Sequence, residues 1–124
     1  MGINNSKTKC YLLDDLNKKH HFYQKNFTIY QEEVFMFFKL NKPLLIEEGQ
    51  LFIYQDGKVK KYIVNLDFKM EKDNLSSLKM GNKEYYEFTI NLPESRKLSF
   101  RLNKEYKLEC LVFKFNSRDL HKIN

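Results

Sequence analysis

Residues 49–66 read GQLFIYQDGKVKKYIVNL and hold two β-prone runs, 49–55 and 59–66, on either side of Asp56-Gly57. Asp-Gly between two such runs is a strong signal for a β-hairpin, because glycine readily adopts the positive φ that a type I′ turn requires. Both runs are rich in aromatic and β-branched residues, which favour strands. This stretch therefore predicts an antiparallel hairpin and, with it, a mainly β fold.

A second hairpin is predicted from residues 83–92 and 97–102, joined by a turn at residues 93–96. Apolar and polar residues alternate in both arms, so one face of each arm is expected to lie in the core. The expected core positions are Tyr86, Phe88, Ile90, Leu92, Leu98, Phe100 and Leu102. Residues 33–40 form another apolar run, and Pro43 is expected to end its regular ladder because proline has no backbone N–H to donate.

The segment after Asn103 can be read as a helix or as a strand. In a helix, Asn103 is the N-cap and the apolar positions share one face at i, i+3, i+4 and i+7. These positions are Leu108, Leu111, Val112 and Phe115. In a strand, the alternation breaks at Leu111-Val112. The sequence therefore favours a C-terminal helix that packs its apolar face on the β-layer, with Lys107, Glu109 and Lys114 outside.

These segments predict a small antiparallel barrel or sandwich of about six to seven strands with a C-terminal helix. An OB-like barrel and an all-β sandwich are the alternatives. The 124 residues suffice for one small core, which we assign to a single β-rich domain over residues 27–124. Residues 1–26 are polar and basic and are expected to form a tail or a short helix. Residues 67–82 are ambiguous, and one interpretation is a short strand over residues 68–70 followed by a loop.

The net charge of +6 indicates affinity for an acidic partner such as nucleic acid, anionic lipid or an acidic protein. The chain is 42% hydrophobic and 15% aromatic, which excludes intrinsic disorder. It contains no apolar run of about 18 residues and no apolar core of a secretory signal. Cys10 and Cys110 lie in very different surroundings, which favours free thiols in a reducing compartment.

The first ten residues, MGINNSKTKC, fit the N-myristoylation pattern M-G-x-x-x-S/T through Gly2 and Ser6. One myristoyl chain binds a membrane only marginally, so a stable anchor needs a second lipid or a basic patch. Lys7 and Lys9 supply charge, and Cys10 is a candidate for a second acyl chain. Gly2 and Cys10 are therefore the candidate lipidation sites. The alternative is that Gly2 and Ser6 match the pattern by chance.

Lys58, Lys60 and Lys61 follow directly after the predicted Asp56-Gly57 turn. In a strand, Lys58 and Lys60 share one face. Ammonium groups at the mouth of a hairpin can bind phosphates as point charges. The alternative is a solvated edge that protects the hairpin from aggregation. These three lysines are the candidate phosphate or headgroup-binding residues.

Residue types typical of catalytic sites are scattered along the chain. The four glycines do not cluster into a phosphate loop, and His20, His21 and His121 have no ligand partners at metal-site spacing. Cys110 is expected to be a small buried residue. Adjacent carboxylates such as Asp14-Asp15 point to opposite faces of an extended segment. We therefore expect no enzyme activity, no metal and no cofactor.

The stretch from Gly49 to Leu66 resembles the opening hairpin of pleckstrin-homology domains. In that family, a Gly-x-Leu strand, a turn and a basic-basic-aromatic-aliphatic strand ending in Leu form a recognisable block. The hairpin around residues 86–90 and the expected C-terminal helix are similar in order, so the resemblance covers roughly residues 33–116. It implies a pleckstrin-homology-like fold. The chain departs from the family in having no Trp, which the family carries in its final helix.

In that family, lysines at positions matching Lys58 and Lys60 often contact phosphoinositide headgroups, and the resemblance implies this role here. Together with Gly2 and Cys10, the chain resembles small acylated pleckstrin-homology proteins of alveolate parasites. The resemblance thus implies a location at the cytoplasmic face of a membrane.

The expected function is a non-catalytic membrane-surface adaptor that recruits a protein partner or an anionic lipid headgroup; the oligomeric state is left open. The alternative is a nucleic-acid-binding or structural subunit of a larger assembly. In it, surface aromatics such as Tyr54, Tyr62 and Tyr85 stack on bases while lysines follow the backbone. The structure of the C-terminal segment distinguishes the two hypotheses. A C-terminal helix favours the adaptor, and a strand over residues 107–115 favours the subunit.

Overall fold

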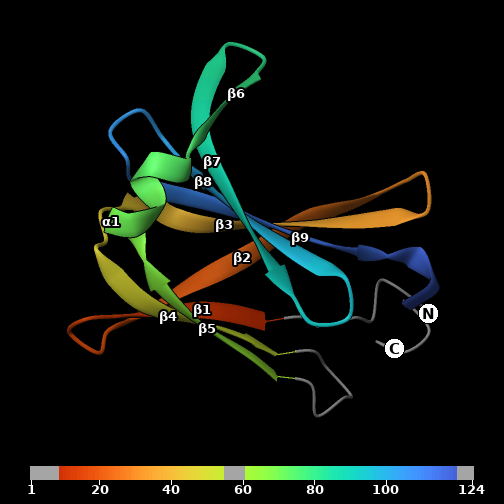
Figure 1. Cartoon of the computed structure of the whole chain (residues 1–124), viewed down its shortest axis with the longest axis horizontal. Helices are drawn as coiled ribbons and strands as arrows, with labels where there is room; N and C mark the ends of the chain where they lie inside the picture. The colour runs from red at the N-terminus through yellow and green to blue at the C-terminus, as the bar shows by residue number, and fades with distance from the viewer. Residues whose placement is uncertain (1–8, 55–60, 120–124) are drawn as a thin grey trace.

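The computed structural model describes residues 9–54 and 61–119. Within these ranges the chain forms nine strands and three short helical turns (Figure 1). The strands are β1 (Lys9–Asp14), β2 (Lys19–Tyr30), β3 (Glu33–Leu44), β4 (Glu48–Tyr54), β5 (Lys61–Asp67), β6 (Ser76–Met80), β7 (Lys83–Leu92), β8 (Arg96–Leu102) and β9 (Leu108–Asn116). The turns are α1 (Phe68–Glu71), η2 (Lys72–Asn74) and η3 (Ser117–Asp119). The mainly β prediction is confirmed, whereas the prediction of six to seven strands is wrong.

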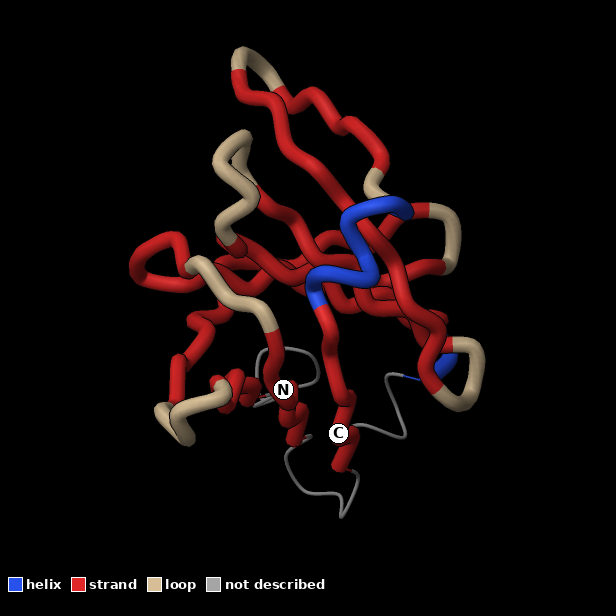
Figure 2. Tube along the Cα trace, turned by 60° about the vertical axis from the view of Figure 1, so that its left-hand side comes forward, coloured by secondary structure: helices blue, strands red, loops and turns tan. Residues whose placement is uncertain are grey.

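All nine described strands belong to one antiparallel sheet in the order β5-β4-β1-β2-β3-β9-β8-β7-β6. The strands β5 and β6 are its edges, so the described strands form an open sheet and not a closed barrel. The sheet bends along β2, whose residues 19–21 pair with β1 and whose residues 22–30 pair with β3. This bend lays β5, β4 and β1 across β3, β9, β8 and β7, as in a sandwich (Figures 1 and 2).

The two layers enclose one apolar core. Leu12 of β1 and Leu51 of β4 are fully buried on one side, and Phe100 of β8 is fully buried on the other. The ring of Tyr62 in β5 lies 6.3 Å from the ring of Phe113 in β9, which joins the layers directly. Burial of this apolar surface supplies the main stabilisation, at about 25 cal/mol per Å².

The structure corrects the prediction of a C-terminal helix, because Leu108–Asn116 form β9 between β3 and β8. The register of β9 against β8 shifts between the pairs Arg101–Cys110 and Leu102–Leu108. This β-bulge turns both Leu108 and Leu111 toward the core, although they are three residues apart. Val112 is buried outside the main core cluster, on the other face of the strand. The bulge thus imitates the spacing of a helix.

The structure also differs from the expected tail or short helix over residues 1–26. Residues 9–14 form β1 in the middle of the sheet, and residues 19–30 form β2. Cys10 and Leu12 point into the core, whereas Tyr11 lies on the outer face. The polar composition of residues 1–26 concealed this strand, because only two of its six residues are buried.

Both predicted hairpins are present as paired strands. The second has the predicted arms, with Phe88, Leu98 and Phe100 buried. In the first, Tyr54 pairs with Lys61, which leaves six residues between them. A two-residue turn at Asp56-Gly57 would instead pair Tyr54 with Val59, so the register does not fit the tight turn. The turn itself lies outside the described residues.

Candidate functional site

The sequence singled out two segments for membrane or phosphate binding, and the sheet register brings their ends together. Gly2, Lys58 and Lys60 lie outside the described residues. Lys9, the first residue of β1, pairs with Tyr54, the last residue of β4. Tyr54 in turn pairs with Lys61, the first residue of β5. The segment that carries Gly2 therefore enters the sheet beside the segment that carries Lys58 and Lys60.

An aromatic cluster covers the outer face of β1 and β4 next to this position. The ring of Tyr11 stacks on Phe52, with centroids 4.9 Å apart, and on Tyr54 at 6.0 Å. The Tyr11 and Tyr54 hydroxyls share a hydrogen bond of 3.4 Å. That bond, with smaller contributions from burial and from the Tyr54 phenol, raises the pKa of Tyr11. The phenol therefore stays neutral at physiological pH.

Cationic and apolar side chains surround these rings. The Lys19 ammonium lies 4.9 Å above the centre of the Tyr11 ring, a cation–π contact, and the His21 ring is 5.8 Å away. Ile63, which pairs with Phe52, is 51% exposed on the edge strand β5. We call Tyr11, Phe52, Tyr54, Lys19 and Ile63 the Tyr11 face.

Charge is polarised along these strands. At one end lie Lys9 and Lys61, the first residues of β1 and β5, which we call the basic end. At the other end lie Asp14, the last residue of β1, and the pair formed by Glu48 of β4 and Asp67 of β5, which we call the acidic end. The acidic end also has cations nearby, because Lys19 of β2 pairs with Leu13 and the Lys69 ammonium pairs with Glu47.

Cys10 is 3% exposed and pairs with Ile53 inside the sheet. Burial raises the pKa of its thiol well above the ordinary value, so the reactive thiolate is suppressed. An acyl chain on Cys10 would require β1 to leave the sheet. In Cys110, burial and the charge of Glu109 also raise the pKa of the thiol. Neither described cysteine has the surroundings of a nucleophile.

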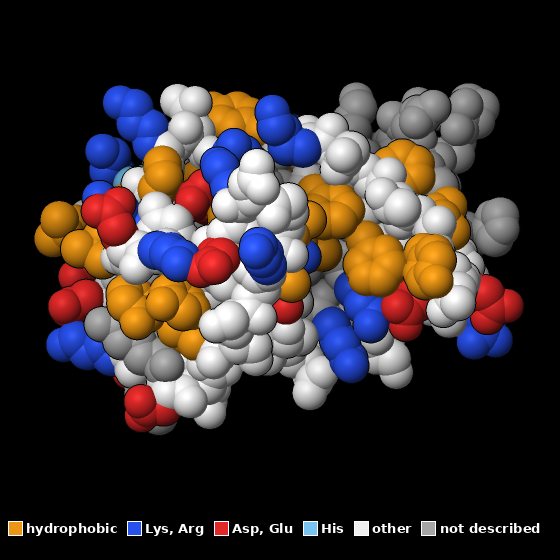
Figure 3. Space-filling view, turned by 90° about the horizontal axis from the view of Figure 1, so that it is seen from above, with side chains coloured by type: hydrophobic (Ala, Val, Ile, Leu, Met, Phe, Trp, Pro, Cys, Tyr) orange, Lys and Arg blue, Asp and Glu red, His pale blue; other side chains and the backbone are white. Residues whose placement is uncertain are grey.

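A second polar and aromatic surface lies on the outer face of β3, β9, β8 and β7. Phe35 and Phe37 are half-buried there. The Lys114 ammonium lies 5.8 Å from the centre of the Phe35 ring, and the Arg101 guanidinium lies 5.9 Å from the centre of the Phe37 ring. Each cation also pairs with a carboxylate, Arg101 with Glu87 at 2.9 Å and Lys114 with Glu33 at 3.2 Å. Figure 3 views this face and shows hydrophobic side chains among Lys and Arg side chains.

Sequence reasoning identified the surface aromatics only in part. Tyr54 and Tyr85 are half-exposed, but Tyr62 is buried in the core. Phe35 and Phe37 were missed, although the alternation in residues 33–40 identifies them as the outward-facing positions once Val34, Met36, Phe38 and Leu40 are assigned to the core.

Residues 9–54 and 61–119 contain no group of three or more His, Cys, Asp and Glu side chains that could hold a metal ion. Within the same ranges, the helical turns are not long or apolar enough to cross a bilayer. Comparison of the chain with protein-family models, curated proteins and solved structures finds no match.

Proposed function

We propose that this chain is a non-catalytic membrane-surface adaptor at the cytoplasmic face of a membrane. An acyl chain on Gly2 and the lysines of the basic end hold the chain on an anionic bilayer, and the rest of the domain recruits a protein partner. The single observation that carries this proposal is the register that sets Lys9, Tyr54 and Lys61 side by side. Lys9 and Lys61 are the described ends of the two segments that carry the candidate residues Gly2, Lys58 and Lys60, which the sequence indicates independently.

The energetics favour such a combination. A single myristoyl chain binds a bilayer with K on the order of 10⁴ M⁻¹, too weak for a stable anchor. Each lysine near an anionic membrane surface adds about 1 kcal/mol. Lys58, Lys60 and Lys61 together can therefore raise the affinity by two powers of ten. On the adjacent Tyr11 face, tyrosine rings and the exposed Ile63 suit the interface between lipid headgroups and acyl chains.

The location at the cytoplasmic face of a membrane is implied by the pleckstrin-homology resemblance, but the fold that the resemblance implies is not part of the proposal. That resemblance expects a helix where the chain has β9, and a final strand by itself favours the alternative of a binding subunit. Cys10 is also left out of the proposed anchor because its thiol is buried in β1.

Vesicle co-sedimentation of the unacylated chain tests the electrostatic part. We expect binding to vesicles that contain phosphatidylserine and none to pure phosphatidylcholine. Lys58→Glu with Lys60→Glu should weaken binding by more than about tenfold, because two favourable charges become repulsive. The control is Lys79→Glu with Lys97→Glu, which makes the same charge change on exposed residues of β6 and β8. Equal losses in both variants, or no binding by the unaltered chain, would reject the proposed site.

A second candidate function is single-stranded nucleic acid binding by the outer face of β3, β9, β8 and β7. The observation that favours it is the row of Phe35 and Phe37 beside Lys114 and Arg101, since rings can stack on bases while cations meet phosphates. Stacking contributes about 1–3 kcal/mol per base. Fluorescence anisotropy with labelled oligo-dT should then show binding that Phe37→Ala weakens at least about fivefold. No binding at low salt would eliminate this candidate.

A further inference from the structure

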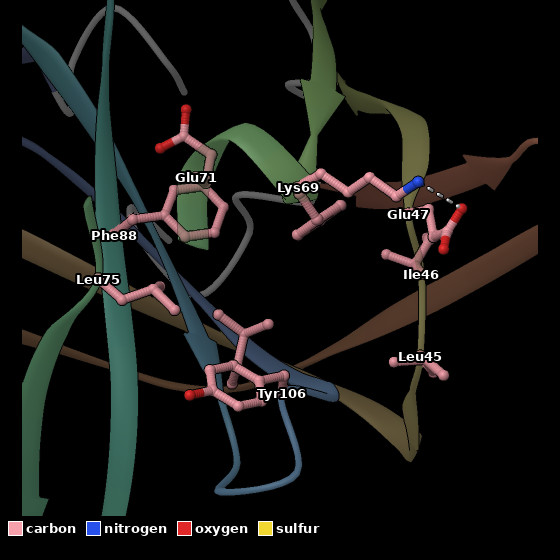
Figure 4. Close-up of a pocket in the computed structure, with 10 residues that line it drawn as sticks. Leu45, Ile46, Glu47, Lys69, Glu71, Leu75, Phe88 and Tyr106 are labelled. Carbon is pink, nitrogen blue, oxygen red and sulfur yellow. Dashed lines mark ion pairs between the residues drawn. The ribbon is translucent and has the colours of Figure 1, made fainter. Parts of the chain in front are cut away.

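A cavity of about 210 Å³ opens at the acidic end, where the connection from β3 to β4 meets α1 and the strands β7 and β8 (Figure 4). Its apolar wall combines side chains from five parts of the chain, namely Ile46, Phe68, Leu75, Phe88 and Leu102. Phe68 is fixed edge-on against Phe88, with ring centroids 5.8 Å apart. Phe68, Phe88 and Leu102 are buried core residues, so the wall of the cavity is part of the packed core.

The mouth of this cavity carries large apolar side chains that face solvent. Leu45 is 68% exposed and Tyr106 is 41% exposed. The Tyr106 ring is held in place because it stacks on Tyr86, with centroids 4.9 Å apart and planes within 3° of parallel. Exposed apolar surface beside an apolar cavity is typical of a site that a partner covers.

The charged groups at the mouth are mainly acidic. Glu47 pairs with Lys69 at 3.5 Å, and Glu71 adds a second carboxylate at the mouth (Figure 4). The cavity is thus lined by two carboxylates, Glu47 and Glu71, and by the Lys69 ammonium, and the excess of carboxylates complements a cationic ligand.

The size of the cavity limits what enters it. An apolar cavity of about 150 Å³ holds a benzene molecule, whereas drug-sized ligands need about 300–1,000 Å³. The volume of about 210 Å³ thus suits one aromatic or large aliphatic side chain. A side chain alone would leave Leu45 and Tyr106 uncovered, whereas the backbone of a bound segment would lie across them.

We propose that this cavity is the docking site for a segment of a partner protein in which one Phe- or Leu-sized side chain is flanked by Lys or Arg. The apolar side chain fills the cavity and the flanking cation meets the carboxylates at its mouth. This inference rests on the recruiting part of the proposed function and does not depend on membrane binding.

The position of the cavity suits an adaptor. Glu47 immediately precedes β4, and Tyr54 ends it at the basic end. Seven residues of strand span about 23 Å at roughly 3.3 Å per residue. A chain held on a membrane by its basic end would therefore hold the cavity away from the bilayer, where a partner can reach it.

NMR titration of the unacylated, ¹⁵N-labelled chain tests the inference without any membrane. The probe is the peptide acetyl-Gly-Lys-Phe-Lys-Gly-amide, compared with the same peptide carrying Ala in place of Phe or Glu in place of both Lys. We expect saturable shifts of the Ile46, Leu75 and Tyr106 amides with the first peptide. Both altered peptides should bind at least about fivefold more weakly.

Variants of the protein separate the two contributions. Glu71→Gln should weaken binding of the Lys-containing peptide about threefold or more. It should leave the binding of a peptide with two Gln in place of Lys unchanged. Leu45→Ala should weaken the binding of both peptides. The fold tolerates this change because Leu45 is 68% exposed. Glu32→Gln, in the exposed turn between β2 and β3, is the control and should change neither. Absence of saturable shifts, shifts located elsewhere, or equal binding of the Glu-containing peptide would overturn the inference.

A failure here is distinguishable from a failure of the adaptor proposal. In the adaptor proposal, vesicle binding depends on Lys58 and Lys60, whereas the peptide titration uses no lipid and is read out at residues that line the cavity. Peptide binding without vesicle binding would support the docking site alone.

Discussion

The ring of Tyr11 in β1 stacks on the ring of Phe52 in β4, with centroids 4.9 Å apart and planes 13° from parallel. This contact lies on the outer face of the sheet, two pairs away from the position where Lys9 meets Tyr54. It fixes the start of the chain's first strand against the hairpin that leads to Lys58 and Lys60. The geometry of the basic end therefore depends on an aromatic contact outside the main core.

Tyr11→Ala should lower the free energy of unfolding by about 1–3 kcal/mol, because it removes the stack on Phe52 and part of the apolar surface. Tyr11→Phe keeps the stack and loses only the bond to Tyr54, so it should cost less than about 1.5 kcal/mol. Urea unfolding followed by circular dichroism measures both. Equal stability of Tyr11→Ala and the unaltered chain would show that the stack is not structural.

Cys10 should not react with iodoacetamide in the folded protein, because its side chain is buried and burial raises the pKa of its thiol. It should react fully in denaturant, whereas the half-buried Cys110 should react slowly in the folded state. Peptide mapping by mass spectrometry after timed labelling distinguishes the two thiols. Rapid native labelling of Cys10 would mean that β1 opens readily, and would restore this residue as a candidate for acylation.

Asp14 should make the stability of the fold depend on pH. Its carboxylate accepts hydrogen bonds from the His20 ring at 2.8 Å and from the Lys18 and Leu16 backbone N–H groups, and these bonds lower the pKa of Asp14. A carboxyl group whose pKa is lowered by folding stabilises the protein above its ordinary pKa. That stabilisation is lost as the pH falls through the folded-state value.

The unaltered chain should therefore exceed Asp14→Asn in free energy of unfolding by the largest amount at about pH 5. This difference should be smaller at about pH 2.5. Urea midpoints at the two pH values provide the measurement. Asp15→Asn, an exposed neighbour, is the control. A difference that stays constant between the two pH values would contradict the assignment to Asp14.

Leu111→Ala should cost about 2–5 kcal/mol, because the side chain is fully buried at the centre of β9. Val112→Ala should cost less than Leu111→Ala, since it removes fewer atoms and lies outside the main core cluster. Thermal or urea unfolding of the two variants gives the comparison. A larger cost for Val112→Ala would indicate that the outer face of β9 contributes more to stability than the core.

The regular part of the fold could be predicted from residue patterns. The arms of the hairpin over residues 83–102 alternate apolar and polar residues, and they form β7 and β8 as expected. The C-terminal strand could not be predicted, because the bulge before Cys110 places Leu108 and Leu111 on one face and so mimics helical spacing. A bulge depends on its partner strand, and single-sequence periodicity contains no information about that partner.

The candidate sites were predictable as segments but not as a surface. The sequence identifies Gly2 and the lysines after Asp56-Gly57 separately, and only the pairing of Lys9 with Tyr54 shows that the described ends of these two segments are neighbours in the sheet. That pairing joins residues 45 positions apart. The cavity near Glu71 left no local signal either, because its wall combines β3–β4, α1, β7 and β8.

The intact mass of the protein isolated from its native source tests the central claim most directly. The adaptor proposal predicts that Met1 is absent and that Gly2 carries a C14 acyl chain. It also predicts that Gly2→Ala moves the protein from the membrane fraction to the soluble fraction of its cells. A native mass equal to that of the unmodified chain with Met1 in place would contradict membrane anchoring through Gly2.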